Sequence, residues 1–512
     1  MGQMKLRGLR EFARSGLMAL ALVLLAACAP LQPVDLPPEP ALPASHAPFW
    51  QEVTAHETDN WFYLLNAGEE GLEWRLRAID SAQVSLDMET FLWKPDSAGY
   101  QVLAHLLAAA DRGVRVRLLL DDSFTMHEDL MLHAVAEHPN VEIRIYNPFR
   151  YRSDNAVLRQ LFNLGEFART NHRMHNKAMV VDGQAAIVGG RNLADEYFGR
   201  HAEMNFRDME VITVGSSVPP VIGHFDRFWN SGWAFPIADI VDIDEDGPGI
   251  ADIRQRLAEH AEPVPAQSRR TLTAAWALLS SRAYPGAADF FFDYPPGPGP
   301  GAPAEQHDPL ALELYRLLDS AREEITLVTA YLVPTPELEA HVEAAVARGV
   351  RVRILTNSLR SNNHLAAHAA YRGHVERLVD HGADLHEVRA LAVDRHRYMR
   401  LPVDDKTLGL HAKLLLVDGD TCFVGSANLD PRSLNINTEV GLIIRSPDLN
   451  AALRERLEID FHPRNAWAVR RGESGDLEWV GHDRVLQHQP SESAVQRLED
   501  WFIGLLPIDA QM

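Results

Sequence analysis

The chain contains the segment His175-Asn-Lys-Ala-Met-Val-Val-Asp182-Gly-Gln-Ala-Ala-Ile-Val-Gly189-Gly-Arg-Asn192 and repeats its pattern in His411-Ala-Lys-Leu-Leu-Leu-Val-Asp418-Gly-Asp-Thr-Cys-Phe-Val-Gly425-Ser-Ala-Asn428. Both copies read His-x-Lys-x4-Asp-x6-Gly-(Gly or Ser)-x-Asn, and they are offset by 236 residues. The hexapeptide Arg112-Gly-Val-Arg-Val-Arg117 recurs at the same offset as Arg348-Gly-Val-Arg-Val-Arg353. A shared offset over separated features indicates two copies of one structural unit.

Apolar runs and helical periodicity alternate in each unit. In the first unit we expect strands over 84–88, 114–120 and 141–146 and a helix over 100–112. In the second unit we expect strands over 325–330, 350–355 and 384–388, with a helix that begins at Thr335-Pro336 and runs to about Arg348. This alternation predicts an α/β fold in which each unit is a mixed sheet flanked by helices.

The motif spacing predicts one site shared by the two units. Histidine and lysine two residues apart on a strand point to the same face, and the Gly-x-x-Asn turn returns the asparagine beside them. Two units facing each other across a pseudo-two-fold axis would pool two imidazoles, two ammonium groups and two carboxamides. Such a donor set suits a phosphodiester, with one histidine as nucleophile and one as general acid. We expect no metal ion or other cofactor, and the alternative is a pair of core histidines with surface lysines.

The composition limits the range of partners. The 512 residues carry 49 Lys and Arg against 71 Asp and Glu, a formal net charge of -22. This balance argues against a nucleic-acid partner bound through bulk positive charge. Only five of the basic residues are lysines, and Lys177 and Lys413 of the repeated motif are two of them. We therefore expect attraction for an anionic substrate to be local.

The first residues are typical of an export signal. A positive stretch precedes an apolar run over 17–27, which is too short to span a bilayer because a span needs about 20 residues. The run ends in Leu25-Ala-Ala-Cys28, which resembles the lipobox of bacterial lipoproteins and implies a lipidated Cys28. The alternative is a buried cysteine that ends a hydrophobic helix. The second cysteine, Cys422, lies in an apolar run and is expected to be a core thiol.

The repeat sets the expected domain boundaries. We expect a signal peptide at 1–27, an extended Pro-rich tether at 28–60, a first domain at 61–260, a connecting segment at 261–310 and a second domain at 311–512. The connecting segment contains Tyr294-Pro-Pro-Gly-Pro-Gly-Pro-Gly301, which is incompatible with regular structure. We interpret it as a mobile loop, more plausibly a passive linker than a functional lid.

The two motifs resemble the HKD signature of the phospholipase D superfamily, and the resemblance runs from about residue 61 to the C-terminus. It implies a duplicated domain with one active site at the interface and transfer through a covalent phosphohistidine. By this analogy one of His175 and His411 attacks phosphorus, and the other protonates the leaving alcohol and then activates the incoming one. We assign His175 as the nucleophile, with His411 as the alternative. Four further side chains would hold the phosphate oxygens, namely Lys177, Lys413, Asn192 and Asn428.

The resemblance also implies roles for four acidic residues. Asp182 and Asp418, the aspartates of the motif, would orient strands and loops rather than touch substrate. Glu439 follows His411 by 28 residues and matches the family carboxylate that accepts a hydrogen bond from a catalytic histidine. Asp208 is its expected counterpart, 33 residues after His175. Such a partner fixes the tautomer and favours the imidazolium. The alternative is that Glu439 and Asp208 are surface charges.

Several local features resemble the bacterial cardiolipin synthases, particularly the C type. They are Asn171-His-Arg-Met-His-Asn-Lys177, Gly189-Gly-Arg-Asn192, Tyr331-Leu-Val-Pro-Thr335, Leu355-Thr-Asn-Ser-Leu359 and Asn428-Leu-Asp-Pro-Arg-Ser433. This resemblance implies transfer of a phosphatidyl group onto the glycerol headgroup of phosphatidylglycerol, with release of glycerol or ethanolamine. The expected partners are phosphatidylglycerol, phosphatidylethanolamine and a membrane surface reached through the anchor on Cys28. The expected location is the bacterial cell envelope, facing the periplasm and compatible with the outer membrane.

Other functions are weighed against this one. A phospholipase D that transfers the phosphatidyl group to water would carry the same motifs, as would a phosphodiesterase of nucleic acid. A lipid-anchored scaffold without activity is disfavoured by the complete motif in both copies. Arg191 and Arg432 are expected either to form structural salt bridges or to contact lipid headgroups.

Overall fold

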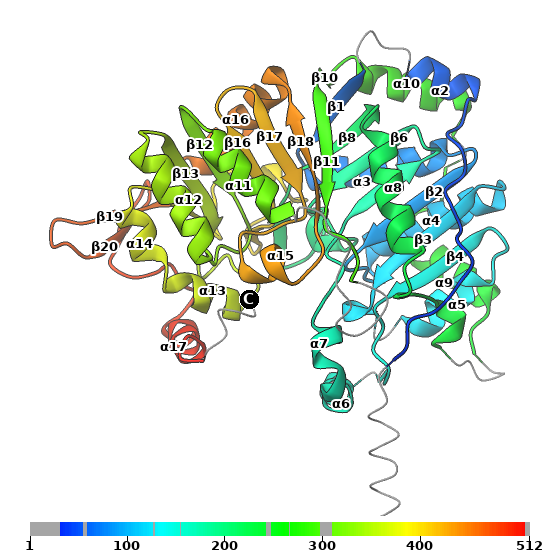
Figure 1. Cartoon of the computed structure of the whole chain (residues 1–512), viewed down its shortest axis with the longest axis horizontal. Coiled ribbons are helices and arrows are strands. Elements are labelled where there is room, and N and C mark those ends of the chain that lie inside the picture. The colour runs from blue at the N-terminus through cyan, green and yellow to red at the C-terminus, as the bar shows by residue number, and fades with distance from the viewer. Residues whose placement is uncertain are drawn as a thin grey trace, which may run out of the picture.

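The computed structural model describes residues 31–54, 59–125, 128–153, 155–241, 247–265, 267–296 and 310–506. Figure 1 shows two α/β halves side by side, the first coloured from blue to green and the second from green to red. Each half is built on one large sheet that contains parallel and antiparallel strands. The predicted duplicated α/β fold with mixed sheets is confirmed.

In the described part of the first half, nine strands form a single sheet. Its parallel core is β2-β3-β4, and antiparallel strands extend it on both sides. The strand order is β10 (Tyr284–Pro285), β1 (Asn60–Leu65), β8 (Glu210–Gly215), β6 (Ala185–Gly189), β5 (Ala178–Val181), β2 (Ser85–Thr90), β3 (Arg115–Asp121), β4 (Val141–Tyr146) and β9 (Ala234–Pro236).

The second sheet repeats this topology with ten strands in the described residues. Its parallel core is β12-β13-β14. The strand order is β11 (Ala287–Phe292), β18 (Val440–Arg445), β17 (Thr421–Gly425), β16 (Leu414–Val417), β12 (Glu324–Val328), β13 (Arg351–Asn357), β14 (Asp384–Val388), β19 (Ala466–Arg471), β20 (Leu477–Val480) and β21 (Val485–Leu486). The short parallel pair β7 (Met204–Arg207) and β15 (Thr407–Leu410) joins the two halves.

The predicted helices are present at equivalent places in the two halves. The helix expected over 100–112 is α4 (Ser97–Asp111), and the helix expected after Thr335 is α12 (Pro336–Ala347). The Thr335 side chain caps α12 by accepting a hydrogen bond from the N–H of Leu338, as its position in the sequence predicts. α3 (Gly68–Ser81) packs with α4 on the first sheet, and α11 (Leu310–Ser320) packs with α12 on the second.

The inner faces of the two sheets pack against each other. Phe62, Val180 and Val188 of the first half belong to the same buried cluster as Leu416 and Leu442 of the second. α8 (Val218–Trp229) and α16 (Pro447–Phe461) also contribute apolar side chains to this cluster. Because the interface is built like a domain core, it fixes the two halves relative to each other and so positions any group that they share.

The Pro-rich segment expected to be a tether lies against the first half. Residues 31–47 have no regular structure and are followed by the short helix α2 (Pro48–Val53). Trp50 is fully buried, and its Nε1–H donates a 2.6 Å hydrogen bond to Asp182. Glu39 accepts hydrogen bonds from Arg144 and from the indole of Trp229. The segment is therefore not a free spacer. Releasing it would expose the buried indole of Trp50 to water, which is costly.

Parts of the sequence interpretation fall outside the described residues. They include the signal peptide and Cys28, and residues 297–309 of the connecting segment with most of its Pro/Gly loop. Across the ranges that the structure describes, no helix combines the length and the apolar character that crossing a bilayer requires.

Candidate active site

The two motif histidines lie in extended segments that precede the predicted strands. β5 begins at Ala178 and β16 at Leu414, so the expectation that His175 and His411 sit within a strand of their own sheet is wrong. The backbone N–H of His175 donates to the carbonyl of Thr438, and that of His411 donates to the carbonyl of Arg207. Each segment therefore leaves its own sheet to bond with the opposite half of the molecule.

The histidines are paired crosswise with carboxylates of the opposite half. His175 Nδ1 lies 2.9 Å from both carboxylate oxygens of Glu439, and His411 Nδ1 lies 2.8 Å from Asp208 Oδ2. Glu439 directly precedes β18, and Asp208 lies between β7 and β8. A carboxylate on Nδ1 fixes the ring and leaves Nε2 as the nitrogen that can react.

The two pairs differ at the residue beside the carboxylate. The hydroxyl of Ser426 donates a hydrogen bond to Glu439 Oε2. The equivalent residue of the first motif is Gly190, where an added Cβ would lie 2.7 Å from Asp208 Oδ1. That oxygen instead accepts a 2.8 Å hydrogen bond from the N–H of Met209. At this position of the motif, Ser426 therefore binds Glu439 in the second half, whereas Gly190 leaves room for Asp208 in the first half.

Both motif lysines are buried beside the histidines. Lys177 Nζ donates a 2.7 Å hydrogen bond to the carbonyl of His175, and Lys413 Nζ lies 3.0 Å from His411 Nδ1. Burial lowers the pKa of Lys177 to about 7 and that of Lys413 to about 8, although Glu439 and Asp208 act in the opposite direction. Two buried lysines whose pKa values are lowered mainly by desolvation are stabilised in their charged form by a nearby anion.

The surroundings of the two motif histidines disfavour the imidazolium form. Burial and the adjacent ammonium groups lower the pKa of His175 well below its usual value, and they lower the pKa of His411 to about 3. Asp208 favours the imidazolium of His411, as expected, but desolvation and the positive charges of the lysines outweigh its effect.

The pKa values of the two carboxyl groups, Glu439 and Asp208, are shifted in opposite directions. Burial raises the pKa of Glu439 to about 8, against the opposing effect of Lys177. Burial would also raise the pKa of Asp208, but the hydrogen bond from His411 and the charge of Lys413 outweigh it and lower the pKa to about 2. The two halves are therefore related by symmetry in shape but differ in protonation.

The two motif asparagines each bury an unused amide oxygen. Asn192 and Asn428 are almost inaccessible, and among the described residues neither Oδ1 atom has a hydrogen-bond partner. An amide can exchange its oxygen and nitrogen by a half-turn, so each group can present either an acceptor or donors to a ligand. Buried polar groups of this kind are usually completed by a ligand or by water.

The motif aspartates lie at the opposite end of β5 and β16 from the histidines. The Asp182 carboxylate accepts hydrogen bonds from the backbone N–H groups of Gln83, Val84 and Ser85 and from Trp50 Nε1. The Asp418 carboxylate accepts equivalent bonds from three consecutive N–H groups, those of residues 322–324. Both aspartates take the left-handed backbone conformation, with φ of 53° and 47°. These contacts tie the turn after the motif strand to the start of the neighbouring strand.

The two arginines are engaged with protein groups. Arg191 is buried and donates to Glu210 at 2.9 Å and to the carbonyl of Asp208. Arg432 donates to the side chain of Asn171 at 2.7 Å and to its carbonyl at 3.1 Å, which links the second half to the segment before His175. The arginines were expected to form structural salt bridges or to contact lipid headgroups, and Arg191 forms a structural salt bridge.

Sequence reasoning missed the hydroxyl of Ser426 and the carbonyls of Thr438 and Arg207 as supports of the site. The equivalence of Ser426 to Gly190 in the repeat was visible, but its contact with Glu439 was not. The carbonyls act through the backbone, so no residue type in the sequence marks them.

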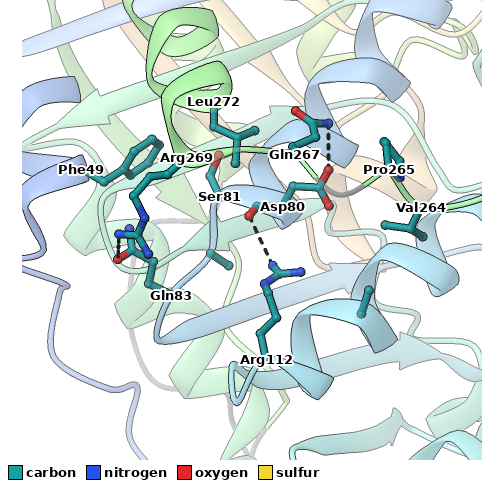
Figure 2. Close-up of a pocket in the computed structure, with 12 residues that line it drawn as sticks. Phe49, Asp80, Ser81, Gln83, Arg112, Val264, Pro265, Gln267, Arg269 and Leu272 are labelled. Carbon is teal, nitrogen blue, oxygen red and sulfur yellow. Dashed lines mark hydrogen bonds between the residues drawn. The ribbon is translucent and has the colours of Figure 1, made fainter.

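A cavity of about 460 Å³ lies away from the histidines. Figure 2 shows its polar side chains paired with one another, with Gln267 bonded to Asp80 and Arg269 to Gln83. The N–H of Gln83 is also one of the groups that bind Asp182, which places this cavity at the end of the sheet remote from the catalytic motifs. No residue of the two His-x-Lys motifs lines the cavity.

Comparison with known proteins agrees with this geometry. Residues 76–229 and 314–461 match the family described as "Cardiolipin synthase, PLD-like domain". The chain is 33% identical over 457 residues to cardiolipin synthase C of Escherichia coli, covering 85% of this chain and 92% of that protein. It is 28% identical over 402 residues to cardiolipin synthase B of the same species, covering 78% and 79%. The fold matches the crystal structure of phosphatidylserine synthase from Haemophilus influenzae with a TM-score of 0.56 and 15% identity, over 88% of this chain and 95% of that one.

Proposed function

Because the chain belongs to the PLD-like cardiolipin synthase family, we propose that it is a membrane-anchored phosphatidyltransferase that makes cardiolipin. The observation that carries this proposal is the pair of crosswise contacts, His175 with Glu439 and His411 with Asp208, around two buried lysines. Two imidazoles oriented through Nδ1 and set beside two buried lysines fit the transfer of a phosphodiester.

In the first step, His175 Nε2 attacks the phosphorus of one phospholipid. The phosphorus–nitrogen bond forms as the bond to the leaving headgroup alcohol breaks, and His411 Nε2 donates its proton to that oxygen. In the second step, the glycerol hydroxyl of phosphatidylglycerol gives its proton to His411 Nε2 as its oxygen attacks phosphorus. The phosphorus–nitrogen bond then breaks, which releases cardiolipin and restores the neutral imidazole of His175 and the protonated imidazole of His411.

A bound phosphodiester would favour the protonated form of the general acid. Burial and the lysine charges lower the pKa of both histidines. The phosphodiester places a negative charge beside Lys177 and Lys413 and offsets their repulsion of a protonated imidazole. The amides of Asn192 and Asn428 complete the donor set around phosphorus.

The anchor and the location are part of the same proposal. Acylation of Cys28 would hold the enzyme at a membrane of the bacterial cell envelope, where both substrate lipids reside. Mass spectrometry of the protein purified from a bacterial membrane tests this, because acylation adds diacylglycerol to Cys28. An unmodified residue 28 would contradict it.

Product analysis tests the reaction. Purified protein is incubated with vesicles of phosphatidylglycerol, with and without phosphatidylethanolamine, and the lipids and released headgroups are separated. The expected products are cardiolipin with an equal amount of glycerol or ethanolamine. Accumulation of phosphatidic acid without cardiolipin would contradict the transferase and identify a hydrolase.

A further inference from the structure

Two exposed apolar surfaces project from the molecule. The first, the α6–α7 patch, lies on α6 (Ala156–Phe162) and on the residues that continue into α7 (Phe167–Thr170). It consists of Val157, Leu158, Leu161, Phe162, Leu164 and Phe167. The second, the α17 patch, lies on and directly after α17 (Ala494–Ile503) and consists of Val495, Leu498, Trp501, Phe502, Leu505 and Leu506. Contiguous apolar groups on a protein surface mark a site of contact with another apolar surface.

Each helix turns one charged side chain inward and several apolar side chains outward. Arg159 of α6 is 2% exposed and donates to the carbonyl of Asp122, while Val157 beside it is 73% exposed. Asp500 of α17 is 1% exposed and bonds to His368 at 2.8 Å, while Trp501 is 47% exposed. A helix that faces water normally has the reverse arrangement. The inward charges hold these helices in place, so the outward apolar side chains are a fixed feature of the fold.

The two patches flank the edge of the molecule where the histidines lie. α7 ends five residues before His175, and Asn171 between them is bonded to Arg432 of the opposite half. On the other side, the N–H of Arg360 bonds to the carbonyl of Pro490 near the start of α17, and Asn357 at the end of β13 bonds to the carbonyl of Leu410, next to His411. Figure 1 shows α6, α7 and α17 projecting from the same lower side of the two halves.

The described chain begins on the α6–α7 patch. The N–H of Leu31 donates a hydrogen bond to Glu166, which lies between Leu164 and Phe167. Cys28 is three residues earlier, so its Cα is at most about 11 Å from that of Leu31. An acyl chain on Cys28 would therefore enter a bilayer beside this patch.

We propose that the α6–α7 patch and the α17 patch are the two contacts by which the protein docks on a bilayer of anionic phospholipid. The side chains insert at the interface, and the edge that carries His175 and His411 then faces the headgroups. The proposal rests on the proposed function for the choice of lipid as the occupant. It accounts for the exposed apolar side chains on the two helices that flank the edge with the histidines.

Vesicle binding of three matched variants tests the proposal. The protein used is the chain from residue 29, which lacks the acylated cysteine but keeps every residue that the structure describes. Leu161→Asp in the first patch and Leu498→Asp in the second change helical leucines that are 56% and 53% exposed. Leu278→Asp is the control, because Leu278 is 54% exposed on α10 (Arg269–Ser280), which Figure 1 places at the opposite side.

Sedimentation with vesicles of phosphatidylglycerol and phosphatidylethanolamine gives the readout. We expect Leu161→Asp and Leu498→Asp each to weaken binding by about tenfold or more, because an acidic side chain would have to enter the interface. Leu278→Asp should bind like the parent chain. Equal vesicle binding by all three variants would overturn the proposal. Unchanged vesicle binding by the patch variants, together with dissociation of a dimer in sedimentation velocity, would also overturn it.

Activity on two forms of substrate separates docking from catalysis. On vesicles, the two patch variants should lose activity in proportion to their binding. On short-chain phosphatidylglycerol below its micelle concentration, docking is not needed, so a loss there would mean that the variants damage the fold or the site and would count against the proposal. If the parent chain acts on neither substrate, the proposed function fails, while the vesicle-binding result still decides the docking surface.

Discussion

His175 Nδ1 lies 2.9 Å from both carboxylate oxygens of Glu439, a residue 264 positions later in the chain and in the opposite half of the molecule. The equivalent pair, His411 with Asp208, crosses the interface in the reverse direction. Neither motif histidine is paired with a carboxylate of its own half. Duplication has therefore produced one site that requires both copies, in place of two independent sites.

The carboxyl groups of the two pairs should affect stability with different pH dependence. The folded chain keeps a proton on Glu439 up to about pH 8, whereas the unfolded group loses it near 4.5. Its contribution is complete below about pH 4.5 and is lost as the pH rises through about 8. Asp208, with its pKa lowered to about 2 from 3.8, contributes fully above 3.8 and loses this only in acid.

Urea unfolding of Glu439→Gln and Asp208→Asn from about pH 5 to about pH 8 measures this difference. The unfolding free energy of the wild type relative to Glu439→Gln should fall with rising pH, by up to about 1.4 kcal/mol per pH unit. The same difference relative to Asp208→Asn should stay flat. Parallel curves for the two variants would show that the carboxyl groups share one environment, contrary to our account.

The small residue at position 190 should be required for the placement of Asp208. In Gly190→Ser, the new Cβ would lie 2.7 Å from Asp208 Oδ1 and displace the carboxylate that orients His411. We expect kcat to fall by about a hundredfold, because a shift of about 1 Å at a catalytic group has an effect of that size. Gly223→Ser is the matched control, since an added Cβ there meets no atom within 4 Å. Unchanged kcat in Gly190→Ser would show that Asp208 does not control the histidine.

The two motif aspartates should differ in their importance for stability. Asp182 accepts three backbone N–H groups and the indole of buried Trp50, whereas Asp418 accepts three N–H groups at an exposed turn. Asparagine tolerates the left-handed conformation of both, so the substitution isolates the hydrogen bonds. We expect Asp182→Asn to lose about 2 kcal/mol and Asp418→Asn about half of that in urea unfolding. Equal losses would mean that the N-terminal segment adds nothing to this anchor.

The repeat in the sequence was sufficient to predict the architecture. A constant offset of 236 residues requires two similar halves, and the alternation of apolar runs and helical patterns gave β4 and β14 with their observed bounds. The motif also marked the residues of the site, because phosphoryl transfer needs these side-chain types together. These features are encoded locally, so they can be read without knowledge of the packing.

The contacts between the halves could not be read in this way. No spacing rule relates Glu439 to His175 across 264 residues, and the backbone bond from His175 to Thr438 that draws the motif out of its strand leaves no trace in residue type. The lowered pKa values of the histidines could not be predicted, because the sequence shows the carboxylate partner but not the burial, which has the larger effect. The docked position of Trp50 likewise depends on its partner, Asp182.

Cardiolipin formation by the wild type, His175→Ala and His411→Ala tests the shared site most directly. All three proteins are assayed on the same phosphatidylglycerol vesicles, with folding checked by thermal unfolding. We predict that the wild type forms cardiolipin and that each variant is slower by at least about a thousandfold, with no further loss in the double variant because the two residues act as a unit. A single variant that forms cardiolipin at the wild-type rate would contradict the account.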